Sequence, residues 1–215
     1  MTKKTRKPVA AIIMASGFSR RMGTNKLALQ LDSRTVIEHV MDQVGALRYE
    51  PVIVVSQYDQ ILLWADERGF YPLANPYAAE GKSSSIRLGA CALETLTAEG
   101  KFQPAVGMAF FTGDQILLSD DLLRDLIDTF LAQPDRVVFP VYDGEAGSPA
   151  IFPVDMIPRL KKLEEEEGGM KAARECEDRI IYVPAMPGWQ GMDFDTAEDW
   201  EKVKALWAAS KSIRG

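Results

Sequence analysis

The sequence predicts an α/β fold in which helices cover both faces of a mostly parallel central sheet. Short apolar segments rich in β-branched residues have the character of buried strands, at residues 9–14, 51–56, 105–111, 136–141 and 179–183. Helical patterns separate most of these segments, and the chain shows no repeat period. Because strands joined through helices lie parallel in one sheet, the alternation predicts a three-layer α/β sandwich.

Composition limits the classes of protein that this chain can be. Its 215 residues, 47% of them hydrophobic, suffice for one domain with a sizeable core, and nothing in the sequence resembles a linker. The net charge of −6 argues against a general nucleic-acid-binding protein. No segment approaches the roughly 20 apolar residues of a membrane span.

Cysteine and histidine usage indicates a reducing compartment. The two cysteines, Cys91 and Cys176, lie far apart, and His39 is the single histidine. This pattern argues against a structural zinc site and against a catalytic pair that needs histidine. The pair Arg20-Arg21 resembles part of an export signal, but no apolar segment follows it. We therefore expect a cytoplasmic protein.

The loop that follows the first predicted strand, residues 15–26, has the strongest functional signal. It combines glycines and hydroxyl residues with Arg20, Arg21 and Lys26. Glycine lets the backbone turn sharply and bring its N–H groups close to a ligand. With three cations in the same loop, this stretch is suited to a polyphosphate.

Local signals define the next elements along the chain. Thr35 and Glu38 have the spacing of a capping box, so a helix is expected to begin there, with His39 on it as a helix-surface or packing residue. A second helix is expected over 59–68, followed by a weak strand over 70–73.

A Gly-Lys-Ser sequence begins the stretch 81–89, which continues with helical periodicity. Such a helix start either caps the helix or binds an anion through free N–H groups. It is not a Walker A loop, because that motif requires glycine where Pro76 stands.

An acidic residue stands directly after the third predicted strand. Asp114 comes too early to cap the next helix, which Ser119 begins. Ligands of open α/β sheets bind at the carboxyl ends of the strands, so Asp114 is a candidate functional residue.

The last third of the chain contains a turn over 144–149, an apolar segment over 150–152 and an acidic run, 164–167, that we interpret as a solvated helix end. Trp189 lies in a Gly-rich loop where it either covers a ligand or fills the core. A final helix is expected over 197–208, with Thr196 as its cap.

Two further carboxylates, Asp193 and Asp195, alternate about Phe194. If this segment is a strand, both carboxylates point to one side and can face a cation. Together with the basic loop and Asp114, they indicate metal-assisted chemistry at a nucleotide phosphorus, in which carboxylates and phosphate oxygens share a Mg²⁺ ion.

Four motifs in order resemble the nucleotidyltransferases. Residues 15–26 resemble the signature Leu-Ala-Ala-Gly-x-Ser-x-Arg-Met-Gly with its later lysine, and 113–115 resemble the Gly-Asp-Gln-Pro metal motif. Asn75-Pro76 with 81–89 resembles an Asn-Pro … Gly-x-x-Ser-Ser segment, and 193–199 resembles Asp-Ile-Asp-Thr-Pro-Glu-Asp. The resemblance runs from about residue 9 to residue 207.

Within the MobA-like NTP transferase superfamily, the chain is most similar to the molybdenum cofactor cytidylyltransferase family. That resemblance implies a Rossmann-like three-layer sandwich formed by one NTP-transferase domain over 1–215, with a basic arm at 1–7 and a C-terminal tail at 209–215. It implies CTP as substrate, Mg²⁺ or Mn²⁺ as cofactor and a molybdopterin-type phosphate as acceptor. A molybdenum hydroxylase apoenzyme is an implied partner.

The resemblance also implies roles for individual residues. The implied nucleotide-binding residues are Ala15, Ser16, Gly17, Ser19, Arg20, Gly23, Lys26, Asn75, Ser84 and Gly113. The implied catalytic residues are Arg21, Lys26 and Asp114. The implied metal ligands are Asp114 and Asp195. The implied acceptor-binding residues are Ser148, Lys171 and Asp193.

The sequence departs from the family pattern at four positions. Ser16 replaces an alanine, Ile116 a proline, Ser148 a histidine and Gly169 an aspartate. The last two lie where the acceptor is expected. Two other hypotheses therefore remain: a guanylyl or other small-phosphate nucleotidyltransferase, and a non-catalytic cofactor-binding accessory protein of molybdenum hydroxylases.

Overall fold

The computed structural model describes residues 8–47 and 49–214, with side chains described up to residue 210. The strands of the main sheet are β1 (Val9–Ala15), β4 (Tyr49–Ser56), β5 (Tyr71–Ala74), β6 (Gly107–Thr112), β7 (Val137–Tyr142), β8 (Glu145–Ala146), β9 (Ala150–Pro153) and β10 (Ile180–Pro184). Their order is β10-β7-β9-β6-β1-β4-β5, with β8 paired to β7. A separate hairpin joins β2 (Gln30–Leu31) and β3 (Arg34–Thr35).

The sheet is mostly parallel, as the sequence predicts. Strand β1 pairs in parallel with β4 and β6, β4 with β5, and β7 with β10. The apolar segment after β7 forms β9, which runs antiparallel to both β6 and β7. A tight turn at Asp143 and Gly144, both with positive φ, connects β7 to β8 without a helix. Because so short a connection reverses the chain direction, β8 runs antiparallel to β7.

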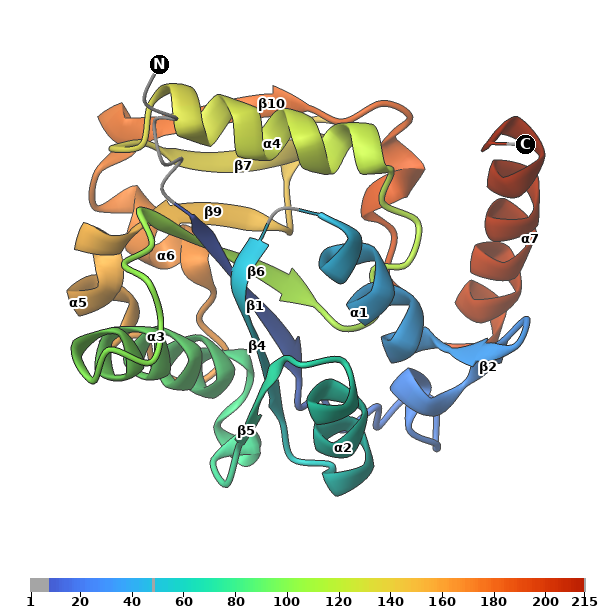
Figure 1. Cartoon of the computed structure of the whole chain (residues 1–215). Helices are drawn as coiled ribbons and strands as arrows, with labels where there is room; N and C mark the ends of the chain where they lie inside the picture. The colour runs from blue at the N-terminus through green and yellow to red at the C-terminus, as the bar shows by residue number, and fades with distance from the viewer. Residues whose placement is uncertain (1–7, 48, 215) are drawn as a thin grey trace, which may run out of the picture.

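The helices are α1 (Val36–Ala46), α2 (Asp59–Glu67), α3 (Lys82–Ala98), α4 (Asp120–Ala132), α5 (Ile157–Leu160), α6 (Gly169–Arg174) and α7 (Ala197–Arg214). Short 3-10 helices are η1 (Lys26–Ala28), η2 (Ala78–Glu80), η3 (Val154–Met156), η4 (Glu177–Arg179) and η5 (Gly188–Gly191). Figure 1 shows α3 on one side of the central strands and α1 and α4 on the other.

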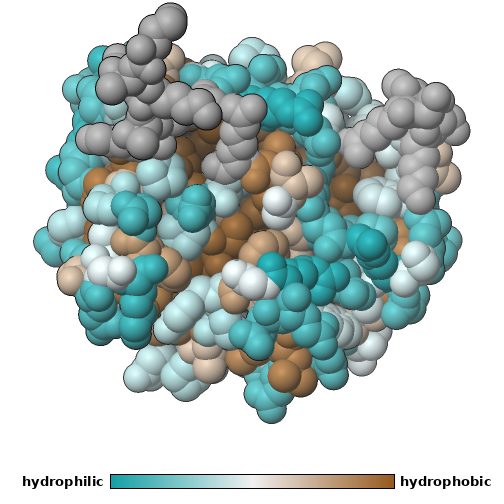
Figure 2. Space-filling model, viewed as in Figure 1, coloured by the Kyte–Doolittle hydropathy of each residue, from teal (hydrophilic) through white to brown (hydrophobic). Residues whose placement is uncertain are grey.

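Two hydrophobic cores, one on each face of the sheet, give the three layers. Successive residues of β1 alternate between them: Ala11 and Ile13 pack with α1, α2 and α4, whereas Ala10 and Ile12 pack with α3, α5 and α6. On the face of the molecule in Figure 2, hydrophilic residues surround smaller hydrophobic areas. The predicted α/β class is therefore confirmed, with the sheet buried on both faces.

The predicted helix starts are also confirmed. Thr35 and Glu38 form a capping box, with the Glu38 carboxylate accepting from the Thr35 N–H at 2.9 Å. Ser119 accepts from Leu122 N–H at 3.2 Å, and Thr196 accepts from Asp199 N–H at 3.1 Å. These caps satisfy amides that the helices leave unpaired.

Several boundary predictions are wrong. The acidic run 164–167 is a connection between α5 and α6 rather than a helix end, and Glu165 adopts a positive φ of 44° there. Helix α7 continues to Arg214, beyond its expected end at 208 and through most of the expected tail 209–215, because no glycine or proline interrupts it. The predicted basic arm 1–7 lies outside the described residues.

Two interpretations of single residues are settled by packing. The Nε2 atom of His39 lies 2.9 Å from the carbonyl oxygen of Leu31, and the His39 ring lies against Trp207, which makes it the expected packing histidine. Trp189 is partly buried and packs against the hydrophobic core that contains α1, α2 and α4, as a core-filling residue. Across the described residues, no helix has the length and apolar character to cross a bilayer.

Tyr49 provides a test of the core around β4. Its hydroxyl is buried without a hydrogen-bond partner among the described residues, and burial raises its pKa well above the usual range. We expect Tyr49→Phe to raise the free energy of unfolding by about 1 kcal/mol, because an unpaired buried hydroxyl is costly. Urea unfolding measures the change, with Tyr182→Phe on an exposed ring as the control. Destabilisation by Tyr49→Phe would contradict this assignment.

Candidate functional site

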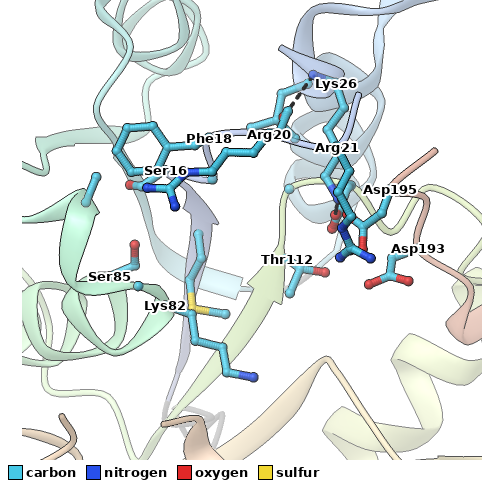
Figure 3. A pocket seen from close by; sticks show the side chains of 18 of the residues that line it. Ser16, Phe18, Arg20, Arg21, Lys26, Lys82, Ser85, Thr112, Asp193 and Asp195 are labelled. Atoms are coloured by element: carbon cyan, nitrogen blue, oxygen red, sulfur yellow. Dashed lines mark hydrogen bonds and ion pairs between the residues drawn. The ribbon is translucent and has the colours of Figure 1, made fainter. Parts of the chain in front are cut away.

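A pocket of about 500 Å³ opens where β1 and β6 end. These strands are parallel neighbours with Met14 opposite Thr112, so the residues that follow them lie together. The lining residues are Met14, Ser16, Gly17, Phe18, Ser19, Arg20, Arg21, Lys26, Leu27, Ala78, Ala79, Gly81, Lys82, Ser85, Thr112, Gly113, Asp114, Glu166, Asp193 and Asp195. Figure 3 shows their side chains converging from several segments of the chain.

The loop after β1 turns through residues with left-handed backbone. Ser19 and Gly23 have φ of 51° and 68°, and the Ser19 carbonyl accepts from Met22 N–H at 3.0 Å. The Ser19 hydroxyl then accepts from Lys26 N–H at 3.1 Å, and Asn25 caps η1. These bonds return the chain to the pocket, so that Lys26 faces into it.

Lys26 lies at the centre of the charged part of the pocket. Its Nζ atom is 2.6 Å from Asp114 Oδ2, 2.8 Å from Asp195 Oδ1 and 2.9 Å from the carbonyl oxygen of Phe194. Burial alone would lower the pKa of Lys26, but the attraction of Asp114 and hydrogen bonds to Asp114 and Asp195 raise it. Lys26 is therefore a buried ammonium that joins three distant segments of the chain.

Arg21 and Asp193 complete the charged part of the pocket. Arg21 also hydrogen-bonds to Asp195. Asp193 lines the pocket beside Asp195 in Figure 3, although residues 193–195 form no strand. Burial, and then the neighbouring charge of Asp114, raise the pKa of Asp193. Carboxylates from two segments thus converge on one ammonium.

A buried polar network supports the pocket from behind. Asn75 Nδ2 lies 3.1 Å from Ser16 Oγ, 3.0 Å from Ser84 Oγ and 3.1 Å from Ser85 Oγ. The Ser16 hydroxyl donates to the carbonyl oxygen of Val55 at 3.2 Å. The network ties the ends of β1, β4 and β5 to the start of α3.

Most of the residues predicted for the site line the pocket: Ser16, Gly17, Ser19, Arg20, Arg21, Lys26, Gly113, Asp114, Asp193 and Asp195. Four predicted nucleotide-binding residues do not: Ala15, Gly23, Asn75 and Ser84. Ala15 is fully buried in the core, Gly23 shapes the loop, and Asn75 and Ser84 belong to the supporting network.

Two predicted acceptor-binding residues also lie outside the lining. The carbonyl oxygen of Ser148 accepts from the Tyr142 hydroxyl at 2.7 Å in the turn before β9. Lys171 is exposed on α6, with its Nζ 3.6 Å from Glu167 Oε1. Of the three residues expected to meet the acceptor, only Asp193 reaches the pocket.

Packing accounts for two departures from the family pattern. Ile116 is buried in the hydrophobic core on the face of the sheet that α1, α2 and α4 cover, where it fills space. A Cβ atom at Gly169 would lie 2.6 Å from the ring of the buried Phe152. An aspartate at position 169 would therefore displace a core aromatic residue.

Some lining residues escaped the sequence-based assignment. Phe18 is 43% exposed, with the Arg20 guanidinium 5.2 Å from its ring centre. Lys82 belongs to the Gly-Lys-Ser stretch, where the sequence marked the helix start but not the side chain that would reach the pocket. Glu166 belongs to the acidic run whose local pattern indicated only solvent exposure.

Comparison with known families identifies the class. The model described as the MobA-like NTP transferase domain matches residues 11–180. The chain therefore belongs to this family, and it is a nucleotidyltransferase of the MobA-like type.

Named relatives agree with this class. A protein of Mycobacterium marinum (strain ATCC BAA-535 / M), named probable molybdenum cofactor guanylyltransferase, is 34% identical over 192 residues, covering 83% of this chain and 86% of that protein.

Solved structures confirm the Rossmann-like fold. A nucleotidyl transferase from Methanothermobacter thermautotroptrophicus has a TM-score of 0.77 at 17% identity, covering 94% of this chain and 99% of that chain. A complex of Rv0371C with manganese, from Mycobacterium tuberculosis H37Rv, has a TM-score of 0.69 at 19% identity, covering 92% of this chain and 98% of that chain.

The Asn75 network yields a stability prediction. Asn75→Ala leaves buried hydroxyls of Ser16, Ser84 and Ser85 without this partner, so we expect the free energy of unfolding to fall by about 2 kcal/mol. Gln103→Ala, at an exposed loop position, is the control. Equal denaturant midpoints for the two variants would show that the network contributes nothing to stability.

Proposed function

We propose that this protein transfers a nucleotidyl group from a nucleoside triphosphate to the phosphate of a molybdopterin-type acceptor and releases pyrophosphate. The observation that carries this proposal is that one pocket contains the Gly-rich loop, its cations and the Asp114 and Asp195 carboxylates. Such a site stabilises charge on a reacting triphosphate.

The reaction needs no general base. A phosphate monoester has a second pKa of about 6, so its oxygen is already an anionic nucleophile at neutral pH. One acceptor oxygen forms a bond to the α-phosphorus while the bond from that phosphorus to the pyrophosphate oxygen breaks. Arg20, Arg21 and Lys26 line the pocket and would neutralise the charge that moves onto the leaving pyrophosphate.

The residues present fit a divalent cation in part. Carboxylate oxygens such as those of Asp114 and Asp195 suit Mg²⁺ or Mn²⁺, but no three His, Cys, Asp or Glu side chains of the described residues form a metal site by themselves. Triphosphate oxygens and waters would supply the other ligands. The bound cation would neutralise phosphate charge. The manganese complex of the similar M. tuberculosis protein supports this assignment.

For the nucleotide, the resemblance favours CTP, through Ala15-Ser16-Gly17 in the loop and Gln115 after Asp114. The names of the relatives favour a second candidate, GTP. The product would serve a molybdenum hydroxylase apoenzyme in the cytoplasm. A non-catalytic accessory protein would bind the same ligands without releasing pyrophosphate.

Pyrophosphate release tests the function and the nucleotide together. With Mg²⁺ and a molybdopterin phosphate acceptor, we expect release from CTP above that from GTP, ATP or UTP, because the loop has the cytidylyl form. Omitting the acceptor is the control. Pyrophosphate release from GTP alone would show that the nucleotide substrate is GTP and not CTP. Nucleotide binding without any release would favour the non-catalytic accessory protein.

Lys26 and Asp114 are expected to have separable roles. Lys26→Ala should lower turnover by about 100-fold or more, since it removes a cation from the reacting phosphates. Asp114→Asn should raise the Mg²⁺ concentration needed for half-maximal activity. Lys101→Ala, at an exposed lysine outside the pocket, is the control for Lys26.

Steady-state kinetics with a Mg²⁺ titration measure both effects, and circular dichroism checks folding. Near-normal turnover of Lys26→Ala would exclude its catalytic role. An unchanged Mg²⁺ dependence in Asp114→Asn would exclude Asp114 as a metal ligand.

A further inference from the structure

Gln115 is a buried polar residue that follows Asp114 directly and does not line the pocket. It is 7% exposed. Both ends of its side-chain amide are bonded within the protein: Oε1 accepts from the Thr112 hydroxyl at 2.9 Å, and Nε2 donates to the carbonyl oxygen of Gly191 at 3.1 Å. One side chain therefore joins the end of β6 to η5, which comes much later in the chain.

The partners of Gln115 fix the orientation of its amide. A backbone carbonyl oxygen can only accept a hydrogen bond, so the amide nitrogen must face Gly191 and the amide oxygen must face Thr112. A carboxylate at this position could not donate to Gly191, and a methionine would supply no strong donor at all. The site therefore requires an amide, and not merely a buried side chain of this length.

The segment that Gln115 holds carries two carboxylates of the pocket. Asp193 and Asp195 follow Gly191 closely, and the residues between η5 and α7 form no helix or strand. A Cβ atom at Gly191 would lie 2.4 Å from the ring of Tyr142, so the backbone passes close to β7 at this point. Because no ladder of backbone hydrogen bonds fixes the segment, side-chain contacts must place its carboxylates.

Two other contacts hold the same segment. The Phe194 ring is buried in the core, and the Lys26 ammonium lies 2.8 Å from Asp195 Oδ1 and 2.6 Å from Asp114 Oδ2. In the proposed function Lys26 neutralises charge on the reacting phosphates, so its contacts with the carboxylates are not reserved for holding them together. The bonds of Gln115 lie outside the pocket lining, where a ligand in the pocket does not compete for them.

We propose that Gln115 is a positioning residue, which holds segment 192–195 against the end of β6 so that Asp114 and Asp195 can share one divalent cation. This inference rests on the proposed function, in which both carboxylates are metal ligands. Two carboxylates that approach a common point repel each other. The bond from Gln115 to Gly191 opposes the separation of their two segments.

The placement of Gln115 also bears on the choice of nucleotide. The resemblance counts Gln115 among the features of the cytidylyl form, but a side chain outside the pocket lining does not contact a base bound in the pocket. We therefore expect Gln115→Met to change the Kd values for CTP and GTP by the same factor, within about twofold. A selective gain in GTP binding would show that Gln115 reads the base, contrary to this inference.

Hydrogen exchange of Gln115→Met tests the positioning role, with Gln43→Met as the matched control. Gln43 on α1 also bridges two segments, because its Nε2 donates to the Leu118 carbonyl oxygen at 2.7 Å and to Asp120 Oδ1 at 3.0 Å. Both changes remove one bridging amide. We expect exchange of the amides in 191–196 to become about fivefold faster or more in Gln115→Met, and to stay unchanged in Gln43→Met.

A second variant and a binding measurement complete the test. Gln115→Asn keeps the amide but is too short to reach both partners, so it should loosen the same segment. Electron paramagnetic resonance of Mn²⁺ alone, without substrates or turnover, gives the Kd of the bound cation. We expect Gln115→Met to raise this Kd about fivefold or more and Gln43→Met to leave it within about twofold. In Asp195→Asn protein, Gln115→Met should have no further effect, since that ligand is already lost.

The outcomes separate this inference from the catalytic proposal. Unchanged exchange over 191–196 in both Gln115 variants would overturn the inference, and so would faster exchange with an unchanged Kd for Mn²⁺. Faster exchange and a raised Kd would support it even if the wild-type protein releases no pyrophosphate. If the wild-type protein binds no Mn²⁺, the metal site of the proposed function is wrong, and with it the part of the inference that concerns the cation.

Discussion

The arrangement of the pocket depends on one buried ion cluster, in which the Lys26 ammonium contacts Asp114 and Asp195. These residues come from the loop after β1, the end of β6 and the segment before α7, so the cluster joins three parts of the chain that are far apart in sequence. A buried charge is tolerated only when an opposite charge compensates it. The buried Lys26 ammonium therefore requires a carboxylate partner, and the loop must return Lys26 to this point.

The sheet makes that cluster possible. Gly113 N–H donates to the Met14 carbonyl oxygen at 3.0 Å, which extends the β1–β6 pairing to the edge of the pocket. A Cβ atom at Gly113 would lie 3.0 Å from Ile37 Cδ1 and 3.2 Å from that same carbonyl oxygen. Glycine thus lets the chain pass close to β1 and α1 before Asp114 enters the pocket. Backbone pairing thus brings this carboxylate to the edge of the pocket, where it contacts Lys26.

Local chemistry explains what the sequence could predict. Buried strands, helix caps and an acid at a strand end are each encoded within a few residues, and the β1 loop, Asp114, Asp193 and Asp195 were found in this way. The antiparallel direction of β9 and the lining side chains of Lys82 and Glu166 were not predicted, because they depend on packing between distant segments. Gly168 makes room for Lys82, and Phe152 excludes a side chain at Gly169. Ser148 and Lys171 were assigned by resemblance, and neither side chain lines the pocket.

The charge balance of the pocket argues for a cation beyond those that the protein supplies. Among the described lining residues, Arg20, Arg21, Lys26 and Lys82 face as many carboxylates, from Asp114, Glu166, Asp193 and Asp195. Lys26 and Arg21 are already bonded to carboxylates. A triphosphate and a phosphate monoester would together bring a large negative charge into a site that has no net positive charge of its own. In the proposed reaction, a divalent cation between carboxylate and phosphate oxygens would relieve this excess, so binding of the two substrates and of the metal would be interdependent.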